Sequence, residues 1–383
     1  MRLMHLSDLH LGKNILEHSL IEDQRFILEQ ILDIVKNKKV DLVLIVGDVY
    51  DKGIPNVEAV RLFSEFLSNL YRFGVKVCII SGNHDSKDRL SFGNELFVDN
   101  GVYIEGVFDG NLRCVELDDE YGKILIYMLP FIRPADVRGF YSTDVISSYD
   151  DAVRCVIENT DIDSSKRNVI MVHQFVTAKG VDIDRSDSEN LSLGGIDNVD
   201  ISIFDCFDYV AMGHIHRAQK LVKDTARYSG SPLKYSFSEV NHNKSVPIIE
   251  LKDKGNIDIE LVPLSPLRDM RIIQGKLENL LDEEVISVGN RNDYINVVLT
   301  DDDYVLDAIG KLRRIYPNIL KLEYRNRRSI VANETMKVND VSNKSVLDLF
   351  KDFYKKQNYI DLDDERLKIV NRIIKDSKEN FDD

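Results

Sequence analysis

The sequence lacks any long apolar run. Of its 383 residues 43% are hydrophobic, but no stretch is long and uncharged enough to cross a lipid bilayer. The first residues, Met1-Arg2-Leu3-Met4-His5-Leu6, also lack the pattern of a signal peptide. We therefore expect a cytoplasmic protein without a membrane segment. The length predicts a large domain followed by a smaller one.

Cysteine is scarce and widely spaced. No two cysteines form a Cys-x-x-Cys pair, and most of them lie among apolar residues. This pattern argues against a disulfide framework and is typical of reduced, buried thiols. The four cysteines are Cys78, Cys114, Cys155 and Cys206.

Positive charge is also in short supply. The chain has 50 Lys and Arg against 65 Asp and Glu, which gives a formal net charge of −15. This balance argues against a protein that holds nucleic acid by broad electrostatics, because phosphate binding normally requires clustered cations. If the chain acts on DNA, bound metal ions or a partner subunit must supply positive charge. Otherwise the acidity serves only solubility.

What the sequence does contain is a series of five clusters of Asp and His, which include most of its eight histidines. Two divalent ions bound side by side need two sets of ligands and a carboxylate that touches both ions, and such sites attack phosphate esters. The clusters therefore predict a two-metal site. They are Asp8-Leu9-His10, Gly47-Asp48, Gly82-Asn83-His84-Asp85, His173 and Gly213-His214-Ile215-His216.

The clusters follow apolar strands. Residues 3–6, 42–46 and 75–80 read as strands, and residues 21–35 and 57–70 between them have the spacing of helices. Strands at 169–172 and 209–212 precede the last two clusters. Ligands gather beyond the carboxyl ends of strands in layered α/β folds, so this placement predicts one shared site.

The remaining pattern completes an α/β fold with two sheets. We expect helices at 90–98 and 151–157 and a strand at 123–128. Strands at 227–229, 246–251 and 257–261 would form an antiparallel sheet that closes the far edge. The predicted fold is a two-sheet sandwich flanked by helices.

Two prolines in Pro263-Leu264-Ser265-Pro266 predict a domain boundary. Residues 1–265 would form the catalytic domain and residues 266–340 a small α/β unit with strands at 270–273, 294–299 and 319–323 and a helix at 304–315. Residues 341–383 contain amphipathic helical stretches at 346–354 and 367–374 around an acidic segment. This part is either a solvated tail or a docking segment for another protein.

Ligand chemistry suggests how the clusters divide between two ions. Alternation along an extended backbone would point Asp8 and His10 to one side, and Asp48 after a buried strand is the expected bridge. Oxygen and nitrogen ligands without thiolate favour manganese, with iron and zinc as competitors. We predict Asp8, His10, Asp48 and His216 on one ion, and Asp48, Asn83, His173 and His214 on the other.

The remaining histidines have other predicted roles. His84 can reach the scissile group, where it would stabilise developing charge or protonate the leaving oxygen, and Asp85 would orient His84 or the local backbone. His5 is expected to pack on the first strand. His18 and His242 are expected at the surface.

The motifs resemble those of calcineurin-like metallophosphoesterases, and over residues 1 to about 265 they are similar to the SbcD family of nuclease subunits. The stretch from Tyr228 to Glu239 contains no predicted metal ligand, so it distinguishes the family from the wider class. The matching motifs are Ser7-Asp8-Leu9-His10-Leu11-Gly12, Gly47-Asp48-Val49-Tyr50-Asp51, Ser81-Gly82-Asn83-His84-Asp85, His173-Gln174-Phe175, Gly213-His214-Ile215-His216 and Tyr228-Ser229-Gly230-Ser231-Pro232-Leu233-Lys234-Tyr235-Ser236-Phe237-Ser238-Glu239.

The resemblance implies an exonuclease and endonuclease that trims DNA ends and opens hairpins with two manganese ions, in DNA repair and recombination. It implies a partner, SbcC, which is an ATPase with a long coiled coil. Residues 266–340 would be a capping domain that positions DNA, and residues 341–383 would dock the ATPase. The family's seven metal ligands fall on the residues assigned above, and its transition-state histidine falls on His84.

The chain departs from the family pattern at two positions, and the resemblance has one further implication. Related nucleases carry a histidine where this chain has Asp51, which could orient His84. The family often has tryptophan where this chain has Leu9, and the sequence has no tryptophan. The stretches 57–71 and 90–98 are candidates for a homodimer interface or are ordinary core helices.

Two alternative functions remain open from the sequence. The same ligands would suit another phosphodiesterase or a phosphatase. A non-catalytic scaffold for an ATPase would also keep the fold, although such scaffolds tend to lose ligands.

Overall fold

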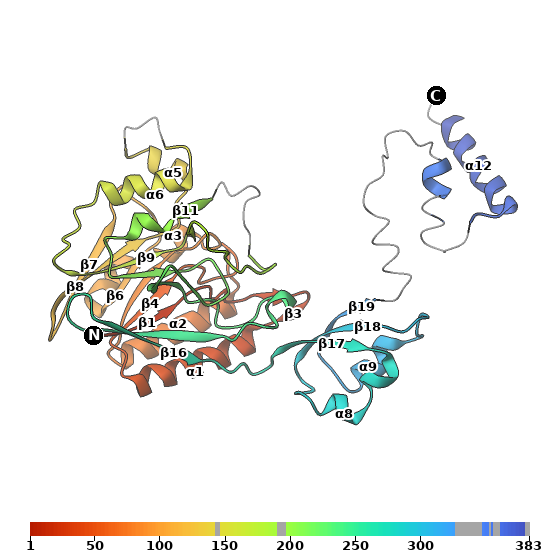
Figure 1. Cartoon of the computed structure of the whole chain (residues 1–383), viewed down its shortest axis with the longest axis horizontal. Helices are drawn as coiled ribbons and strands as arrows, with labels where there is room; N and C mark the ends of the chain where they lie inside the picture. The colour runs from red at the N-terminus through yellow and green to blue at the C-terminus, as the bar shows by residue number, and fades with distance from the viewer. Residues whose placement is uncertain (142–145, 190–196, 326–346, 352–353, 355–360, 380–383) are drawn as a thin grey trace. The chain divides into compact units, whose positions relative to one another are not determined.

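The computed structural model describes residues 1–141, 146–189, 197–325, 347–351, 354 and 361–379 (Figure 1). It divides into two compact units. The first contains Met1–Ile272 and Gly289–Asn296, and the second contains Ile273–Val288 and Val297–Asp383. The predicted boundary after residue 265 lies close to the first break between the units and stays a prediction.

The first sheet has six strands in the order β16-β15-β1-β4-β5-β6. Its central strands are continuous runs of buried apolar residues, which is typical of parallel strands covered on both faces. Strands β1, β4, β5 and β6 are parallel, β15 pairs antiparallel with β1, and β16 pairs antiparallel with β15 at the edge of the sheet. The strands are β1 (Arg2–Leu6), β4 (Leu42–Val46), β5 (Lys76–Ile80), β6 (Val102–Glu105), β15 (Ser245–Leu251) and β16 (Ile257–Pro263).

The second sheet also has six strands, in the order β13-β14-β12-β9-β8-β7. Strands β8, β9, β12 and β14 run parallel, and β7 and β13 are antiparallel edges. The strands are β7 (Arg113–Asp119), β8 (Gly122–Leu129), β9 (Arg167–Val172), β12 (Tyr209–Met212), β13 (Gln219–Leu221) and β14 (Lys223–Tyr228).

The two sheets pack face to face. One buried cluster joins Leu44 and Val46 of the first sheet to Ile126, Val169 and Met171 of the second. This apolar layer confirms the predicted sandwich. Since parallel strands of both sheets contribute to it, their carboxyl ends are held at fixed positions on the sandwich edge.

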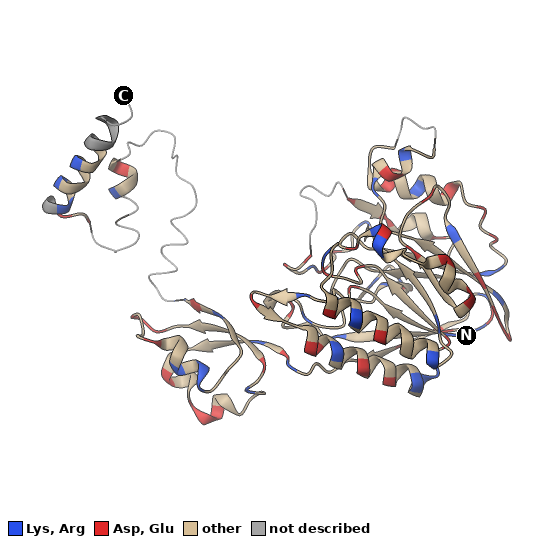
Figure 2. Ribbon diagram, turned by 180° about the vertical axis from the view of Figure 1, so that it is seen from behind, with Lys and Arg blue, Asp and Glu red and all other residues tan. Residues whose placement is uncertain are grey.

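Helices cover the sandwich. Helices α1 (Ile21–Lys38) and α2 (Val57–Arg72) lie side by side along the first sheet (Figure 1), and α6 (Tyr149–Glu158) packs into the core of the second. Figure 2 shows Lys and Arg interspersed with Asp and Glu along α1 and α2. The Asn56 side chain caps α2 by accepting the Ala59 N–H at 2.8 Å.

Short elements connect the larger ones. They are the hairpin β2 (Asn14–Ile15) and β3 (His18–Ser19), the parallel pair β10 (Phe175–Thr177) and β11 (Asn198–Asp200), the helix α5 (Pro134–Arg138), and 3₁₀ turns at Val98–Asn100, Ile201–Phe204 and Phe237–Glu239.

Three predicted elements were wrong in detail. The helix expected at 90–98 is broken into α3 (Lys87–Leu90) and α4 (Asn94–Phe97), because Gly93 between them has φ +73°. The strand expected at 227–229 belongs to β14 and pairs parallel with β12 in the second sheet, whereas β15 and β16 complete the first. The helix expected at 304–315 is confined to α9 (Ala308–Arg313), which Asp307 precedes with a left-handed backbone of φ 51°.

The C-terminal part contains a three-stranded sheet of order β17-β18-β19, with strands β17 (Met270–Gly275), β18 (Tyr294–Leu299) and β19 (Ile319–Tyr324). Short helices α7 (Leu277–Leu280) and α8 (Glu283–Ile286) follow β17. The predicted helix at 346–354 lies partly outside the described residues, of which 347–351 are helical. The second predicted helix is α12 (Asp364–Glu379). No helix within the described ranges is long and apolar enough to span a membrane.

All four cysteines are free thiols. Cys78 is buried in the core, as predicted, but Cys114 and Cys206 are exposed. Cys114 lies on edge strand β7, where alternate residues face outward, and this explains the wrong prediction.

The buried guanidinium of Arg167 at the start of β9 pairs with the partly buried carboxylate of Asp119 at the end of β7, which also pairs with the N-terminal ammonium at 2.6 Å. The guanidinium donates to both carboxylate oxygens, at 3.0 and 2.5 Å. Burial alone would raise the pKa of Asp119, but the hydrogen bonds from Arg167 lower it to about 2. Because this pKa lies below the ordinary value of 3.8, the pair stabilises the fold above that pH and loses its effect as the pH falls toward 2.

We therefore expect Asp119→Asn to lower the free energy of unfolding by about 1–2 kcal/mol at neutral pH. The difference from wild type should shrink below about pH 4 because the wild-type carboxyl then takes up a proton. Urea unfolding at neutral pH and below about pH 4 measures this difference in the free energy of unfolding. A difference that does not change with pH would contradict the assigned role of this ion pair.

Candidate metal centre

The five predicted clusters meet at one edge of the sandwich. Strands β1, β4 and β5 are parallel neighbours in the first sheet, and β9 and β12 are parallel neighbours in the second. Each cluster begins within three residues of its strand's carboxyl end. Six of the seven predicted metal ligands are buried, namely Asp8, His10, Asp48, His173, His214 and His216.

The backbone at these loops is tightly bent. Asp8, His10, Asp48 and His214 all have positive φ, between 43° and 87°. The extended backbone predicted for Asp8-Leu9-His10 is therefore wrong. Its bend is held by backbone bonds, such as His10 N–H to the Asp48 carbonyl at 2.9 Å. Left-handed residues other than glycine are costly and cluster at functional sites.

One group of possible metal ligands consists of Asp8, His10 and His216, whose ligand atoms all lie within 4.8 Å of one another. The two imidazoles face each other, with 3.2 Å between His10 Nε2 and His216 Nε2. The Asp48 Oδ2 atom is 3.6 Å from His10 Nε2. This is the set predicted for the first ion.

A second group surrounds the other side of Asp48. The distance from His173 Nε2 to Asp48 Oδ2 is 3.4 Å. Asn83 Oδ1 lies 3.2 Å from His173 Nε2 and 3.0 Å from His214 Nδ1. The structure thus brings together all seven predicted ligands, with Asp48 between the two groups.

The donor set fits divalent cations. Two carboxylates, Asp8 and Asp48, are buried within a ring of imidazoles, and buried charges require a compensating partner. Burial opposes the charged form of His173, but the Asp48 carboxylate raises the pKa of that imidazole to about 9. Burial lowers the pKa of His214 to about 3. Oxygen and nitrogen ligands without thiolate suit manganese, iron or zinc.

His84 lies next to His10, and together with His10 and Asp51 it forms a further group of possible metal ligands. Its backbone N–H donates to Asp48 Oδ1 at 2.9 Å, and its ring packs edge-on against His10 with 4.8 Å between centroids. Its Nδ1 is 3.0 Å from the backbone carbonyl of Asp51. In the neutral imidazole this bond places the proton on Nδ1, because a carbonyl only accepts.

The carboxylates of Asp51 and Asp85 have different surroundings. The Asp51 carboxylate pairs with Lys13 at 2.7 Å, and the backbone carbonyl of Asp51 accepts the hydrogen bond from the His84 ring. Asp85 accepts backbone N–H groups of Val49, Tyr50 and Gly82 at 3.1, 2.9 and 2.9 Å. Burial and the Asp48 charge raise the pKa of Asp85 to about 6. Asp85 thus ties two ligand loops together through the backbone.

Residues around His216 were missed from the sequence. Its Nδ1 faces Ser188 Oγ at 2.8 Å and Glu239 Oε1 at 3.3 Å. His242, expected at the surface, is buried near Glu239 and was wrongly placed. His5 packs on β1 as expected and bonds Tyr209. Only the resemblance of residues 228–239 could have pointed to Glu239, because His216 and Ser188, which it contacts, are distant in sequence.

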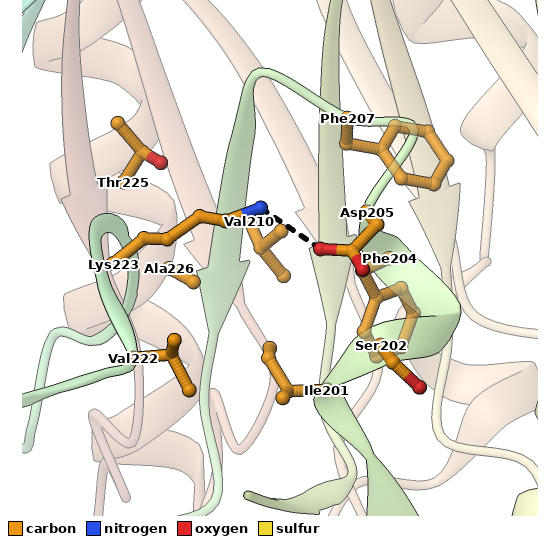
Figure 3. Close-up of a pocket in the computed structure, with 10 residues that line it drawn as sticks. All are labelled: Ile201, Ser202, Phe204, Asp205, Phe207, Val210, Val222, Lys223, Thr225 and Ala226. Carbon is orange, nitrogen blue, oxygen red and sulfur yellow. Dashed lines mark hydrogen bonds and ion pairs between the residues drawn. The ribbon is translucent and has the colours of Figure 1, made fainter.

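Another cavity in the first unit is mostly apolar, unlike the loops of Asp and His residues. Figure 3 shows a pocket of about 350 Å³ whose lining is mostly apolar, with an ion pair of 2.8 Å between Lys223 and Asp205. None of the seven predicted ligands lines it. The candidate chemistry therefore lies in the Asp and His loops.

Comparison with known proteins shows the family to which the chain belongs. The calcineurin-like phosphoesterase family matches residues 1–218, so the class of this protein is a phosphoesterase of that type. The family described as type 5 capsule protein repressor C-terminal domain, SbcD_C, matches residues 266–358. The chain is 35% identical over 328 residues to the SbcD subunit of the nuclease SbcCD of Staphylococcus epidermidis, covering 84% of this chain and 85% of the relative. The chain belongs to the SbcD family.

Two solved structures are similar at lower identity. A dimetal phosphatase from Danio rerio is 11% identical with a TM-score of 0.40, covering 70% of this chain and 98% of that one. A protein of Thermus thermophilus is 10% identical with a TM-score of 0.40, covering 68% and 98%.

Glycine is required where the loops approach one another. A methyl group added at Gly82 would lie 2.1 Å from Asp48 Oδ1 and 2.4 Å from the Asp48 backbone nitrogen. We expect Gly82→Ala to displace Asp48 and to weaken manganese binding by at least about tenfold. Calorimetric titration with Mn²⁺ measures this affinity. Gly139→Ala is the matched control, since a methyl group there meets nothing within 4 Å. Unchanged manganese affinity in Gly82→Ala would contradict this packing.

Proposed function

We propose that this chain is the nuclease subunit of a DNA-processing complex. It hydrolyses phosphodiester bonds at DNA ends and hairpins, in repair and recombination, with two divalent metal ions. The observation that carries the proposal is the convergence of six oxygen and nitrogen side chains around Asp48, three on each side, with His84 beside them. The nuclease named for the Staphylococcus epidermidis relative supports the substrate class.

Asp48 would contribute to both ligand sets. Asp8, His10 and His216 would complete one set, and Asn83, His173 and His214 would complete the other. Manganese is favoured by the mixed ligand set. When bound, two such ions activate water and neutralise negative charge on the scissile phosphate.

The chain's own residues act around that centre. His84 is held by its backbone bond to Asp48 and its ring bond to the Asp51 carbonyl, so the imidazole keeps one orientation. As imidazolium it stabilises charge that develops on the phosphate or donates a proton to the leaving oxygen. Asp85 maintains the spacing between the loops that contribute Asp48 and Asn83.

We expect His84→Gln to keep both metal ions and to lose DNA cleavage by about a hundredfold or more, because the proton donor is removed but no ligand is lost. Asp48→Ala should lose both metal binding and cleavage, because both ligand sets share this carboxylate. The substrates are a labelled hairpin and a linear duplex with Mn²⁺, and bound metal is counted by elemental analysis. His18→Gln, at an exposed histidine, is the control.

Several outcomes would contradict the proposal. Loss of bound metal in His84→Gln would make His84 a structural residue or a ligand. Hydrolysis of a generic phosphodiester dye, nucleotides or phosphopeptides without cleavage of DNA would favour another phosphodiesterase or phosphatase. Full cellular function of Asp48→Ala would favour a scaffold.

We infer that the chain works with an SbcC-type coiled-coil ATPase, as the name of its relative implies for that protein. Residues 341–383 would form the dock. In the described part of this segment, α12 exposes Ile369 and Ile373, which are 59% and 61% exposed and one helical turn apart. The partner would add positive charge to a chain whose net charge is −15. Residues 266–340 would act as the DNA capping domain.

We also infer a homodimer. A cavity of about 700 Å³ lies between α2 and the segment of α3, α4 and β6, with Val60, Phe63 and Tyr71 on one side and Phe92 and Phe97 on the other. Phe92 is 83% exposed. So much apolar surface on one face is typical of an interface between protein subunits.

Phe92→Glu should shift the protein to the monomer, because a charge would be buried in the interface. Multi-angle light scattering at micromolar concentration measures the mass. Val222→Glu is the matched control, since Val222 is 67% exposed and lines the other cavity. A wild-type protein that is strictly monomeric would contradict the inferred dimer.

A further inference from the structure

The segment from Tyr228 to Glu239 contains none of the seven predicted ligands, yet it lies against the candidate metal centre. The Tyr235 hydroxyl donates to the carbonyl of Leu9, between Asp8 and His10, at 2.5 Å. The Tyr235 ring packs edge-on against the imidazoles of His10 and His216, with centroids 5.5 and 5.8 Å apart. The segment therefore contacts two imidazoles of the same ligand group.

The last residue of the segment, Glu239, reaches the outer nitrogen of His216. While His216 Nε2 faces His10, its Nδ1 faces Ser188 Oγ at 2.8 Å and Glu239 Oε1 at 3.3 Å. The Ser188 hydroxyl in turn donates to Glu239 Oε1 at 2.6 Å. A carboxylate only accepts hydrogen bonds, so this chain of bonds requires the proton of a neutral His216 to lie on Nδ1.

Glu239 is itself held from the opposite side. Its side chain is fully buried, and Lys244 Nζ donates to Oε2 at 2.6 Å. The same ammonium donates to the backbone carbonyl of His216 at 2.9 Å and to Ser231 Oγ at 2.8 Å. Lys244 thus fixes both the main chain of His216 and the carboxylate that orients its ring.

The other ligand group is oriented in a different way. His173 Nδ1 bonds the backbone carbonyl of Val46 at 2.7 Å, and this carbonyl belongs to strand β4. No residue of the segment from Tyr228 to Glu239 takes part in that bond. The contacts of Tyr235 and Glu239 described above lie on the group of Asp8, His10 and His216.

We propose that Glu239, with Ser188 and Lys244, is a positioning set for His216. It holds the imidazole in the Nδ1–H form and directs Nε2 to the ion bound by Asp8, His10 and Asp48. Outer carboxylates that accept from ligating histidines orient the ring and raise its basicity. This inference rests on the proposed two-metal function, and it assigns a role to a segment that supplies no ligand.

The test uses the full chain and Mn²⁺. We expect Glu239→Gln, which keeps the size of the side chain but removes its charge, to weaken one of the two manganese sites by about 10–100-fold. The other site should keep its wild-type affinity. Ser188→Ala should weaken the same site by a smaller factor. Competitive titration against a chelator resolves the two affinities, and manganese electron paramagnetic resonance counts the bound ions.

A second readout does not depend on metal or activity. In metal-free protein labelled with ¹⁵N-histidine, long-range proton–nitrogen spectra report which ring nitrogen carries the proton. Wild-type His216 should show only the Nδ1–H form, and Glu239→Gln should show a mixture of both forms. The double variant Glu239→Gln/Lys244→Met removes both buried charges. Compared with Glu239→Gln, the double variant should regain thermal stability, but its manganese site should stay weakened.

Asp119→Asn is the matched control, because it breaks another carboxylate–cation pair at the opposite end of β9. It should lose stability while keeping both manganese sites. The positioning role would be overturned if Glu239→Gln bound both manganese ions with wild-type affinity, if it weakened both sites equally, or if it left the His216 tautomer unchanged. A wild-type protein that binds fewer than two ions would instead contradict the proposed function, and the tautomer measurement would still decide the role of Glu239.

Discussion

The buried carboxylate of Asp48 is the group on which the rest of the site depends. It lies between two sets of imidazoles, 3.6 Å from His10 and 3.4 Å from His173, and it accepts the backbone N–H of His84 at 2.9 Å. A carboxylate this deeply buried requires compensating positive charge, and the surrounding histidines and bound cations can provide it. Its position also explains the glycine at residue 82, because any side chain there would collide with the Asp48 carboxylate.

The sandwich makes this arrangement possible. Parallel strands of both sheets end at the same edge, so loops far apart in sequence deliver side chains to one place. The apolar layer between the sheets fixes how far apart those strand ends lie. Since the ligands come from both sheets, a change in sheet packing would alter the distance between Asp48 and His173. The positive φ values of Asp8, His10, Asp48 and His214 show that the loops carry a conformational cost at this edge.

The strands and the clusters that follow them could be predicted, because buried parallel strands are short apolar runs and the Asp and His residues come directly after them. The break at Gly93 was missed because the apolar spacing of residues 90–98 continues through the glycine. The sheet to which β14 belongs depends on pairing between distant strands, and local alternation does not specify a partner. The contacts of Glu239 with Ser188 and His216 join residues from separate loops, so no sequence period reveals them.

The two ligand groups differ in what orients their histidines. A carbonyl of strand β4 orients His173, and it cannot be removed by changing a side chain. Buried side chains orient His216, with the Glu239–Lys244 pair at their centre. A buried ion pair adds little to stability compared with apolar residues of similar size, so its retention here is better explained by the geometry it imposes on His216. The orientation of His216 can therefore be changed by substituting buried side chains around it, whereas that of His173 is set by the sheet itself.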